Sequence, residues 1–302
     1  GNIKNIKYAD IKKEIIEANP LNLKNYNEKI EYLRECIEET VRYHQISDVP
    51  ITFLLSSGID SSTIISSTKN KKNCNALTLD LDEGKQVYNE KFLAKKTAEI
   101  NSIPHVVEKI NQEEVNFLID QFFKSMDQPT NDGLNSFLIS YISKKKLNSK
   151  VIISGVGGDE FFFGYPSFTR IQKINNMMKF IPNFKIVDKI FKTYFYKFLK
   201  RKKLNTKVSG IYSYGRSTEN TFLLQRSAFL KHEFEDMISP DIFQKGIDEI
   251  DIHNKLNKDI DGIKNTKLSI MYLEIKYYLC SKLLNDLDWT SMHNSIEMRT
   301  PF

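Results

Sequence analysis

The feature that most constrains the fold is an alternation of short apolar runs with stretches of helical periodicity in the first half of the chain. The apolar runs Ile51–Leu55, Ala76–Leu81, Pro104–Val107 and Val151–Ser154 predict buried strands. Apolar residues at helical spacing predict helices over 27–45, from Asp60 onward, and over 89–100, 113–124 and 134–146. Strands that alternate with helices favour the α/β class, with a parallel, doubly wound sheet.

The second half of the chain is predicted to be mostly helical, with a last good helix near residues 268–284. No stretch is rich enough in glycine, proline or serine to divide the chain. We therefore expect one domain over residues 1–302. It would consist of an N-terminal lead-in and helix (1–46), an α/β core (47–165) and a helical part (166–302).

Composition excludes several classes of protein. With 40% hydrophobic and 27% charged residues the chain is typical of a globular protein with a core, and no apolar run has the length of a membrane span. The three cysteines are far apart and form no CxxC pair, which excludes zinc ribbons and the thioredoxin motif and favours a reducing, cytoplasmic location. A start at Gly1 instead of methionine suggests a piece of a longer protein.

The first chemically unusual loop is Ser56–Ser62 (SSGIDSS), which follows the first predicted strand and opens a helix. In a doubly wound sheet, ligands bind beyond the carboxyl ends of the strands. Small residues let backbone amides converge on an anion, and the hydroxyls of Ser56 and Ser61 can donate further hydrogen bonds to phosphate. Bare phosphate would repel Asp60, so its position suggests a bridging Mg²⁺. A serine-capped helix without a ligand is the alternative.

The second loop is Ser154–Glu160 (SGVGGDE), which follows the fourth predicted strand. Its glycines permit a tight turn and a close approach of the backbone to a ligand. If both strands are central, Asp60 and Asp159 come from different strands and share a metal-bound pyrophosphate. A turn with solvated acidic residues is the alternative here.

These loops resemble a known family. Ser56–Ser61 is similar to the pyrophosphate-binding SGGxDS loop of the N-type ATP pyrophosphatases, the PP-loop superfamily. With the preceding SDVP, it resembles specifically the synthetase domain of the asparagine synthetase family. Three further segments resemble signatures of the family and occur in the family's order. MDQP at 126–129 with Asp132 resembles D-E-P…D, and SGVGGDEFFFGY at 154–165 resembles SGxGxDExFxGY. SMHNSIEMRTPF at 291–302 resembles SMxxSxExRxPF.

The resemblance implies a sheet of the adenine-nucleotide alpha hydrolase type and an ATP-dependent carbon–nitrogen ligase with ATP and Mg²⁺ as cofactors. A carboxylate is adenylated, Mg-pyrophosphate leaves, and ammonia or an amine attacks the acyl-adenylate. Catalytic and metal-binding roles are expected for Asp60 and Asp159. The residues expected to bind ATP or its pyrophosphate, with adenine at the backbone of the two leucines, are Leu54, Ser56, Ser57, Gly58, Asp60, Ser61, Leu79, Ser154 and Gly155. The residues expected on the substrate side are Asp127, Asp132, Glu160, Glu297 and Arg299.

The departures from the family pattern also carry information. Ser57 replaces a loop glycine and is expected to crowd the phosphate, partly through a backbone conformation that disfavours a side chain. Val156 stands where asparagine synthetases carry an acidic residue, so the acceptor is expected not to be aspartate. By the resemblance, the catalytic lysine lies beyond the segment that ends at Phe302, and a glutaminase domain or subunit is missing from this chain. The helical part is therefore expected to be truncated at its C-terminus.

Residues 173–207 contain eleven lysines and arginines and a single acidic residue, Asp188, with aromatic residues at near-helical spacing. This pattern indicates either a helical face with solvated lysines or a surface for an acidic partner, such as lipid or nucleic acid. Three hypotheses about function remain open at this point. They are an asparagine synthetase-like ligase, an RNA-modifying PP-loop enzyme, and a catalytically impaired family member that binds nucleotide.

Overall fold

The structure is a computed structural model that describes residues 4, 7–80 and 87–302. The chain divides into two compact units. We call Leu21–Phe162 with Tyr277–Phe302 the sheet unit, and Gly1–Pro20 with Phe163–Lys276 the helical unit.

The sheet unit is built on a parallel sheet whose described strands have the order β3-β2-β1-β4-β5. The strands are β1 (Ile51–Leu54), β2 (Cys74–Asp80), β3 (His105–Lys109), β4 (Val151–Ile153) and β5 (Glu297–Arg299). Central β1 pairs on both sides, with Ile51 opposite Cys74 of β2 and Val151 of β4. The predicted doubly wound parallel sheet is confirmed, because the order reverses between β1 and β4.

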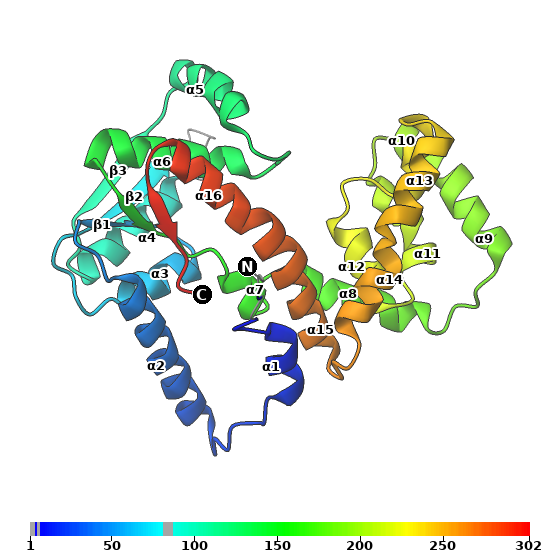
Figure 1. Cartoon of the computed structure of the whole chain (residues 1–302), viewed down its shortest axis with the longest axis horizontal. Helices are drawn as coiled ribbons and strands as arrows, with labels where there is room; N and C mark the ends of the chain where they lie inside the picture. The colour runs from blue at the N-terminus through cyan, green and yellow to red at the C-terminus, as the bar shows by residue number, and fades with distance from the viewer. Residues whose placement is uncertain (1–3, 5–6, 81–86) are drawn as a thin grey trace. The chain divides into compact units, whose positions relative to one another are not determined.

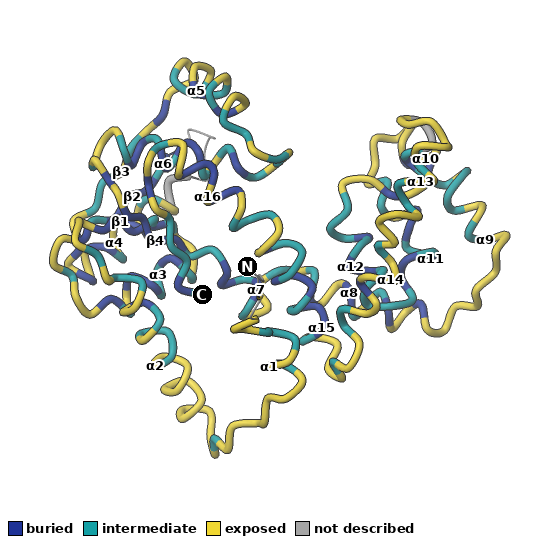
Figure 2. The backbone as a smooth tube through the Cα atoms, viewed as in Figure 1, coloured by how far each residue is buried: buried dark blue, intermediate teal, exposed yellow. Residues whose placement is uncertain are grey.

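Helices cover both faces of this sheet (Figure 1). The helices of the sheet unit are α2 (Tyr26–His44), α3 (Ile59–Ser66), α4 (Val87–Ile100), α5 (Gln112–Ser125), α6 (Gly133–Leu147), α7 (Gly158–Phe161) and α16 (Leu284–His293). One buried cluster joins Phe53 and Ile153 to residues of α2, α3 and α4, and another joins Leu77 to α5, α6 and Trp289. Strands buried on both faces explain the continuous apolar runs in the sequence, and Figure 2 shows β1, β2 and β4 as buried.

The predicted strands and helices of the first half are confirmed, with ends that differ by a few residues. Leu81, the last residue of the second predicted strand, lies outside the described residues. The sequence did not predict β5. This strand is only three residues long and exists through its parallel pairing with β4, in which Glu297 lies opposite Val151 and Arg299 opposite Ile153.

The helical unit confirms the prediction of a mostly helical second half. Its elements are α1 (Ile11–Glu17), α8 (Pro166–Met178), α9 (Lys185–Ile190), η1 (Phe191–Phe195), α10 (Tyr196–Arg201), η2 (Thr206–Gly210), α11 (Ile211–Tyr214), α12 (Thr218–Arg226), η3 (Lys231–Asp236), α13 (Pro240–Ile250), α14 (Ile252–Ile260) and α15 (Thr266–Leu273). Buried polar side chains join α8 to α12, because the Thr221 hydroxyl donates a 2.6 Å hydrogen bond to the Asn175 amide oxygen. Within the unit, Arg226 forms a 2.7 Å ion pair with the fully buried Glu274.

The helix predicted near 268–284 is confirmed and is longer than expected. It begins with α15, continues through the π-helical η4 (Glu274–Leu283) and ends with α16 at His293. The division between the two units falls within η4, after Lys276. Across residues 4, 7–80 and 87–302, no helix combines the length and the apolar composition needed to cross a membrane.

Candidate active site at the carboxyl ends of β1 and β4

Two loops meet where the strand order of the sheet reverses. The loop after β1 leads into α3, and the loop after the neighbouring β4 leads into α7. In open α/β sheets, the crevice at such a reversal is the usual place for a ligand. The structure thus brings together the two loops that the sequence singled out.

The loop after β1 is held by hydrogen bonds among its own serines. The hydroxyls of Ser56 and Ser61 lie 3.0 Å apart, the Ser56 amide donates to Ser61 Oγ at 3.2 Å, and the Gly58 amide donates to Ser56 Oγ at 3.0 Å. Gly58 caps α3 without a side-chain hydrogen bond, so no side chain occupies the cap position of this helix. These hydrogen bonds fix the arrangement of the amides and hydroxyls of the loop. Phosphate oxygens can accept hydrogen bonds from groups of these two kinds.

The backbone strain expected at Ser57 is absent. Among the described residues, those other than glycine with positive φ do not include Ser57. Ser57 is exposed, so the expectation that its backbone disfavours a side chain is wrong.

The loop after β4 uses its glycines for close approach. Gly157 has φ +106°, a conformation that side chains rarely adopt. A Cβ on Gly155 would lie 3.0 Å from the Ser61 amide nitrogen, and a Cβ on Gly158 would lie 2.4 Å from Cγ of Asp60. The loop therefore packs directly against the first turn of α3, and the absent side chain of Gly158 leaves the space in which the Asp60 carboxylate lies.

Asp60 and Asp159 interact electrostatically at this contact. Burial and, after it, the negative charge of Asp159 raise the pKa of the Asp60 carboxyl above its usual value. The nearby negative charge disfavours ionisation of the Asp60 carboxyl, and a bound cation would offset that repulsion.

The donor set fits a divalent cation that is also held by phosphate. Mg²⁺ in phosphate-binding sites commonly takes one or two protein carboxylates and completes its coordination with substrate oxygens and water. Asp60 and Asp159 supply two such carboxylates. In the described part of the chain, no group of three or more His, Cys, Asp or Glu side chains is arranged to hold a metal ion.

A cavity of about 710 Å³ adjoins the first loop within the sheet unit. Ser57 and Asp60 line it from the loop, and Phe162 and Phe302 line it from the other side. Its remaining walls come from α2 and α3. The other residues predicted to bind ATP are not part of this lining, so the cavity lies beside the loop and extends from it toward α2.

The remaining nucleotide-site residues lie at or near the same edge of the sheet. Leu54 ends β1 and Leu79 is the next-to-last residue of β2, and both are half-buried. Ser154 is buried directly after β4, where its amide donates to the Arg299 carbonyl at 2.9 Å and its hydroxyl accepts from the Val156 amide at 3.4 Å.

Two of the predicted substrate-side residues lie on the loop that leads into α6. Asp132 accepts hydrogen bonds from Lys282 at 2.6 Å and from the Tyr278 hydroxyl at 3.4 Å. Asp127 is exposed. The loop is anchored to α16 because the Thr130 hydroxyl donates to the buried Asp286 carboxylate at 2.6 Å.

The other substrate-side residues lie in different surroundings. Glu160 is buried in α7, next in sequence to Asp159. Arg299 on β5 donates from Nη1 to the carbonyls of His44 and Ile46, both at 2.8 Å, and from Nε to Glu297 at 2.7 Å. The hydrogen bond from Arg299 lowers the pKa of Glu297. The Arg299 guanidinium thus satisfies carbonyls at and just beyond the C-terminus of α2, a structural role that the sequence did not predict.

Sequence reasoning also missed Asp80, a buried carboxylate at the carboxyl end of β2. Its side chain is 1% exposed and forms ion pairs with Lys91 of α4 and, at 3.9 Å, with Lys109. An acidic residue at the end of an apolar strand is unusual, and that position was the signal available in the sequence.

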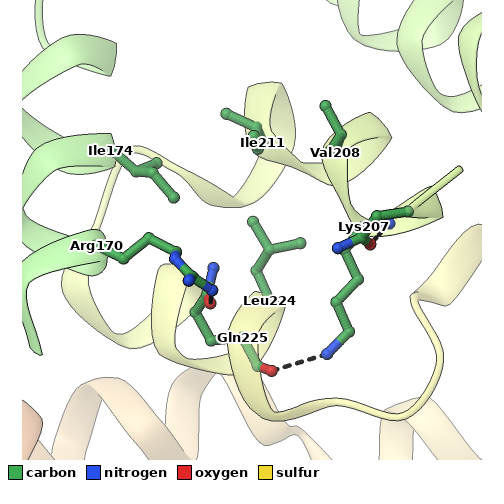
Figure 3. Close-up of a pocket in the computed structure, with 8 residues that line it drawn as sticks. Arg170, Ile174, Lys207, Val208, Ile211, Leu224 and Gln225 are labelled. Carbon is green, nitrogen blue, oxygen red and sulfur yellow. Dashed lines mark hydrogen bonds between the residues drawn. The ribbon is translucent and has the colours of Figure 1, made fainter. Parts of the chain in front are cut away.

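A second cavity, of about 490 Å³, lies in the helical unit between α8, η2, α11 and α12 (Figure 3). Arg170 and Lys207 line it. Arg170 donates to the side-chain oxygen of Gln225 at 3.2 Å, and Lys207 donates to the backbone carbonyl of Gln225 at 2.7 Å. Burial lowers the pKa of Lys207. None of the predicted site residues lines this cavity.

Comparisons with known proteins agree with the motifs. The family model described as asparagine synthase matches residues 32–302. Asparagine synthetase (glutamine-hydrolyzing) 1 of Bacillus subtilis is 24% identical over 276 residues, which are 90% of this chain and 42% of that protein. The putative asparagine synthetase (glutamine-hydrolyzing) 2 of Methanocaldococcus jannaschii is 26% identical over 220 residues, 72% of this chain and 40% of that protein. The chain thus spans about two fifths of the length of these curated relatives.

Solved structures with partial similarity are NAD synthetases. The NH3-dependent enzyme from Campylobacter jejuni is 17% identical with a TM-score of 0.31, over 68% of this chain and 99% of that one. The glutamine-dependent enzyme from Acinetobacter baumannii, in complex with ADP, is 15% identical with a TM-score of 0.32, over 71% of this chain and 48% of that one.

Proposed function

The chain belongs to the asparagine synthase family, and on this premise we propose that it adenylates a carboxylate substrate for attack by ammonia or an amine. The family is one of ATP-dependent carbon–nitrogen ligases. The proposal adds the identity of the reacting site, which is the pair of loops after β1 and β4, and the class of the acceptor.

The chemistry has two balanced steps. A carboxylate oxygen of the acceptor attacks the α-phosphorus of ATP, the bond to the bridging oxygen breaks, and pyrophosphate leaves. The nitrogen nucleophile then attacks the acyl carbon, AMP leaves, and the nitrogen loses a proton. Adenylation is needed because a free carboxylate is a poor electrophile.

The residues of the two loops have separate tasks in this proposal. The amides of the Ser56–Ser61 loop and the hydroxyls of Ser56 and Ser61 bind the pyrophosphate oxygens and stabilise the charge that grows there as the bond breaks. Asp60 and Asp159 would hold Mg²⁺, which would offset the negative charge of the departing pyrophosphate. The backbone of Leu54 and Leu79 would hold adenine, and Ser154 and Gly155 would take part in binding ATP or its pyrophosphate.

The observation that carries the proposal is the position of the Asp60 carboxylate. It lies against Gly158, where a single added carbon would be 2.4 Å from Cγ, and it feels the charge of Asp159. Burial of a carboxyl near a second negative charge lowers the stability of the folded protein. Groups whose pKa is shifted in this way cluster at functional sites.

The acceptor is proposed to be a carboxylate other than aspartate, because Val156 cannot act as the acidic residue that asparagine synthetases have there. Asp127, Asp132 and Glu160 are the proposed substrate-side carboxylates. The nitrogen donor is proposed to be ammonia, supplied by a glutaminase domain or subunit, or an amine. The proposed compartment is the cytoplasm.

The experiment is ATP–pyrophosphate exchange, because exchange reports adenylation without requiring the nitrogen donor. Labelled pyrophosphate is incubated with the protein, Mg²⁺, ATP and one carboxylate from a panel that includes aspartate, glutamate, sugar acids and peptides. We expect label in ATP only when Mg²⁺ and one class of carboxylate are both present. Exchange driven by aspartate would contradict the proposed acceptor class.

Substitutions in the two loops test whether these loops bind Mg-ATP and carry out the exchange. Asp60→Asn and Asp159→Asn should each abolish exchange and Mg-ATP binding measured by isothermal titration. Asp241→Asn, at an exposed acidic residue on α13, is the matched control and should change neither. Exchange that survives both site variants would refute the proposed site. Mg-ATP binding without exchange with any carboxylate would support the alternative of a family member that binds nucleotide but does not catalyse adenylation.

A further inference from the structure

We propose that one face of the helical unit, formed by α9, η1 and α10, binds anionic phospholipid surfaces. This 185–201 face belongs to the helical unit, whereas the proposed nucleotide loops belong to the sheet unit. The argument rests on how the segment is anchored, on what it exposes, and on its charge.

One side of the segment is fixed to the helical unit. Tyr196 and Leu199 are buried, and the ring of Phe191 stacks on Tyr212 with centroids 5.6 Å apart. Tyr212 in turn donates to the Pro182 carbonyl at 2.6 Å. These contacts hold one side of the segment against the helical unit and leave the opposite side facing outward.

That opposite side exposes a stripe of large apolar residues. Ile186, Ile190, Tyr194 and Phe198 are 76%, 46%, 72% and 52% exposed. They are spaced four residues apart, and side chains at this spacing lie above one another on a helix. Scattered exposed apolar residues are ordinary, but four large ones repeated along α9, η1 and α10 favour an interaction surface.

Basic residues border the stripe along its length. Lys185, Lys189, Lys197 and Arg201 are all exposed, and each lies one residue before or three residues after a member of the stripe. Asp188, the single acidic residue between positions 173 and 207, is on the anchored side, where it accepts hydrogen bonds from Lys192 and Ser213. The exposed face therefore combines apolar and positively charged side chains without a carboxylate from its own segment.

This combination fits a bilayer surface better than a nucleic acid. Lysines attract anionic headgroups while apolar side chains enter the boundary between headgroups and acyl chains. Nucleic acids use aromatic rings for stacking, but the aliphatic side chains of Ile186 and Ile190 have no such use. Anionic phospholipid is therefore the occupant that accounts for both parts of the face.

The experiment is co-sedimentation of the protein with large vesicles. One set contains phosphatidylcholine alone, and the other contains phosphatidylcholine and phosphatidylglycerol in equal amounts. We expect sedimentation with the second set only. A basic residue near such a surface contributes about a fivefold gain in binding, so Lys189→Gln with Lys197→Gln should weaken binding about 25-fold. Lys245→Gln with Lys264→Gln, which removes the same charge from exposed positions elsewhere in the unit, should have little effect.

The apolar stripe is tested separately. Ile186→Ser with Tyr194→Ser should reduce vesicle binding, whereas Ile242→Ser, at an exposed isoleucine of α13, should leave it unchanged. In the variant Tyr194→Trp, the new indole emission should shift to shorter wavelength when phosphatidylglycerol vesicles are added. Absence of binding to the anionic vesicles would overturn the proposal. Binding that is unaffected by Ile186→Ser with Tyr194→Ser, and that RNA abolishes, would also overturn it and would indicate a general polyanion surface.

Discussion

The substitution Gly158→Ala tests the contact between the two loops most sharply. The added methyl carbon would lie 2.4 Å from Cγ of Asp60 and 2.7 Å from both carboxylate oxygens. Ordinary contact begins near 3.4 Å. The Asp60 carboxylate must therefore move by about 1 Å, a displacement that can cost roughly a hundredfold in rate when it affects a reacting group.

The fold should tolerate this change. Gly158 is the first residue of α7 and is not among the glycines with positive φ, so alanine is allowed there and favours the helix. The atoms that must move belong to the Asp60 carboxylate and not to the backbone. We expect ATP–pyrophosphate exchange to fall about a hundredfold, with a melting temperature close to that of the unchanged protein.

The matched control is Gly246→Ala, in α13, where an added Cβ has no neighbour within 4 Å. It should leave exchange unchanged and stabilise the helix by up to about 1 kcal/mol. If Gly158→Ala keeps exchange and Mg-ATP binding within twofold of the unchanged protein, the position of Asp60 against Gly158 is not needed for function and our reasoning fails.

Three further predictions follow from charged and polar contacts. Burial and the charge of Asp159 raise the pKa of Asp60, so the ionised carboxylate destabilises the folded protein once pH has risen through the raised pKa. Asp60→Asn should therefore raise the melting temperature at neutral pH but not below about pH 4. An unchanged melting temperature at neutral pH would contradict this. Burial, with a smaller effect of a nearby lysine, lowers the pKa of His105, so stability should fall as pH drops below about 6.5, and thermal melts of His105→Gln should lack this part of the decrease. Arg299→Ala should lower the free energy of unfolding in urea by about 1–3 kcal/mol, because two carbonyls lose their hydrogen-bond donor, and should keep Mg-ATP binding. A loss of Mg-ATP binding in this variant would favour the substrate-side role of Arg299. The control Arg34→Ala, at an exposed ion pair, should lower the free energy of unfolding by less than about 1 kcal/mol.

The local sequence pattern was sufficient to predict the parallel sheet and to single out the two loops. Apolar runs buried on both faces have a strong periodicity signal, and each of the two loops follows such a run directly. Parallel order then placed both loops at one edge of the sheet, where Gly155 and Gly158 of the second loop pack against Asp60 and Ser61 of the first. That Asp60 and Asp159 share a metal ion stays a prediction.

Features that depend on distant parts of the chain were not predictable in this way. β5 pairs with a strand that lies over a hundred residues earlier, and its three residues have no strand pattern of their own. The Arg299 guanidinium finds its acceptors at His44 and Ile46. The expected strain at Ser57 was wrong because the loop keeps this residue out of the left-handed region, which only backbone coordinates reveal.

The most direct test of the central claim is a crystal structure of the protein with Mn²⁺ in place of Mg²⁺ and with an ATP analogue that cannot release pyrophosphate. Anomalous scattering locates the manganese without reference to any assumed site. We predict a manganese ion bound by Asp60 and Asp159 and by phosphate oxygens of the analogue, with those phosphates against the Ser56–Ser61 loop. Nucleotide bound elsewhere, or manganese that contacts neither carboxylate, would contradict the account.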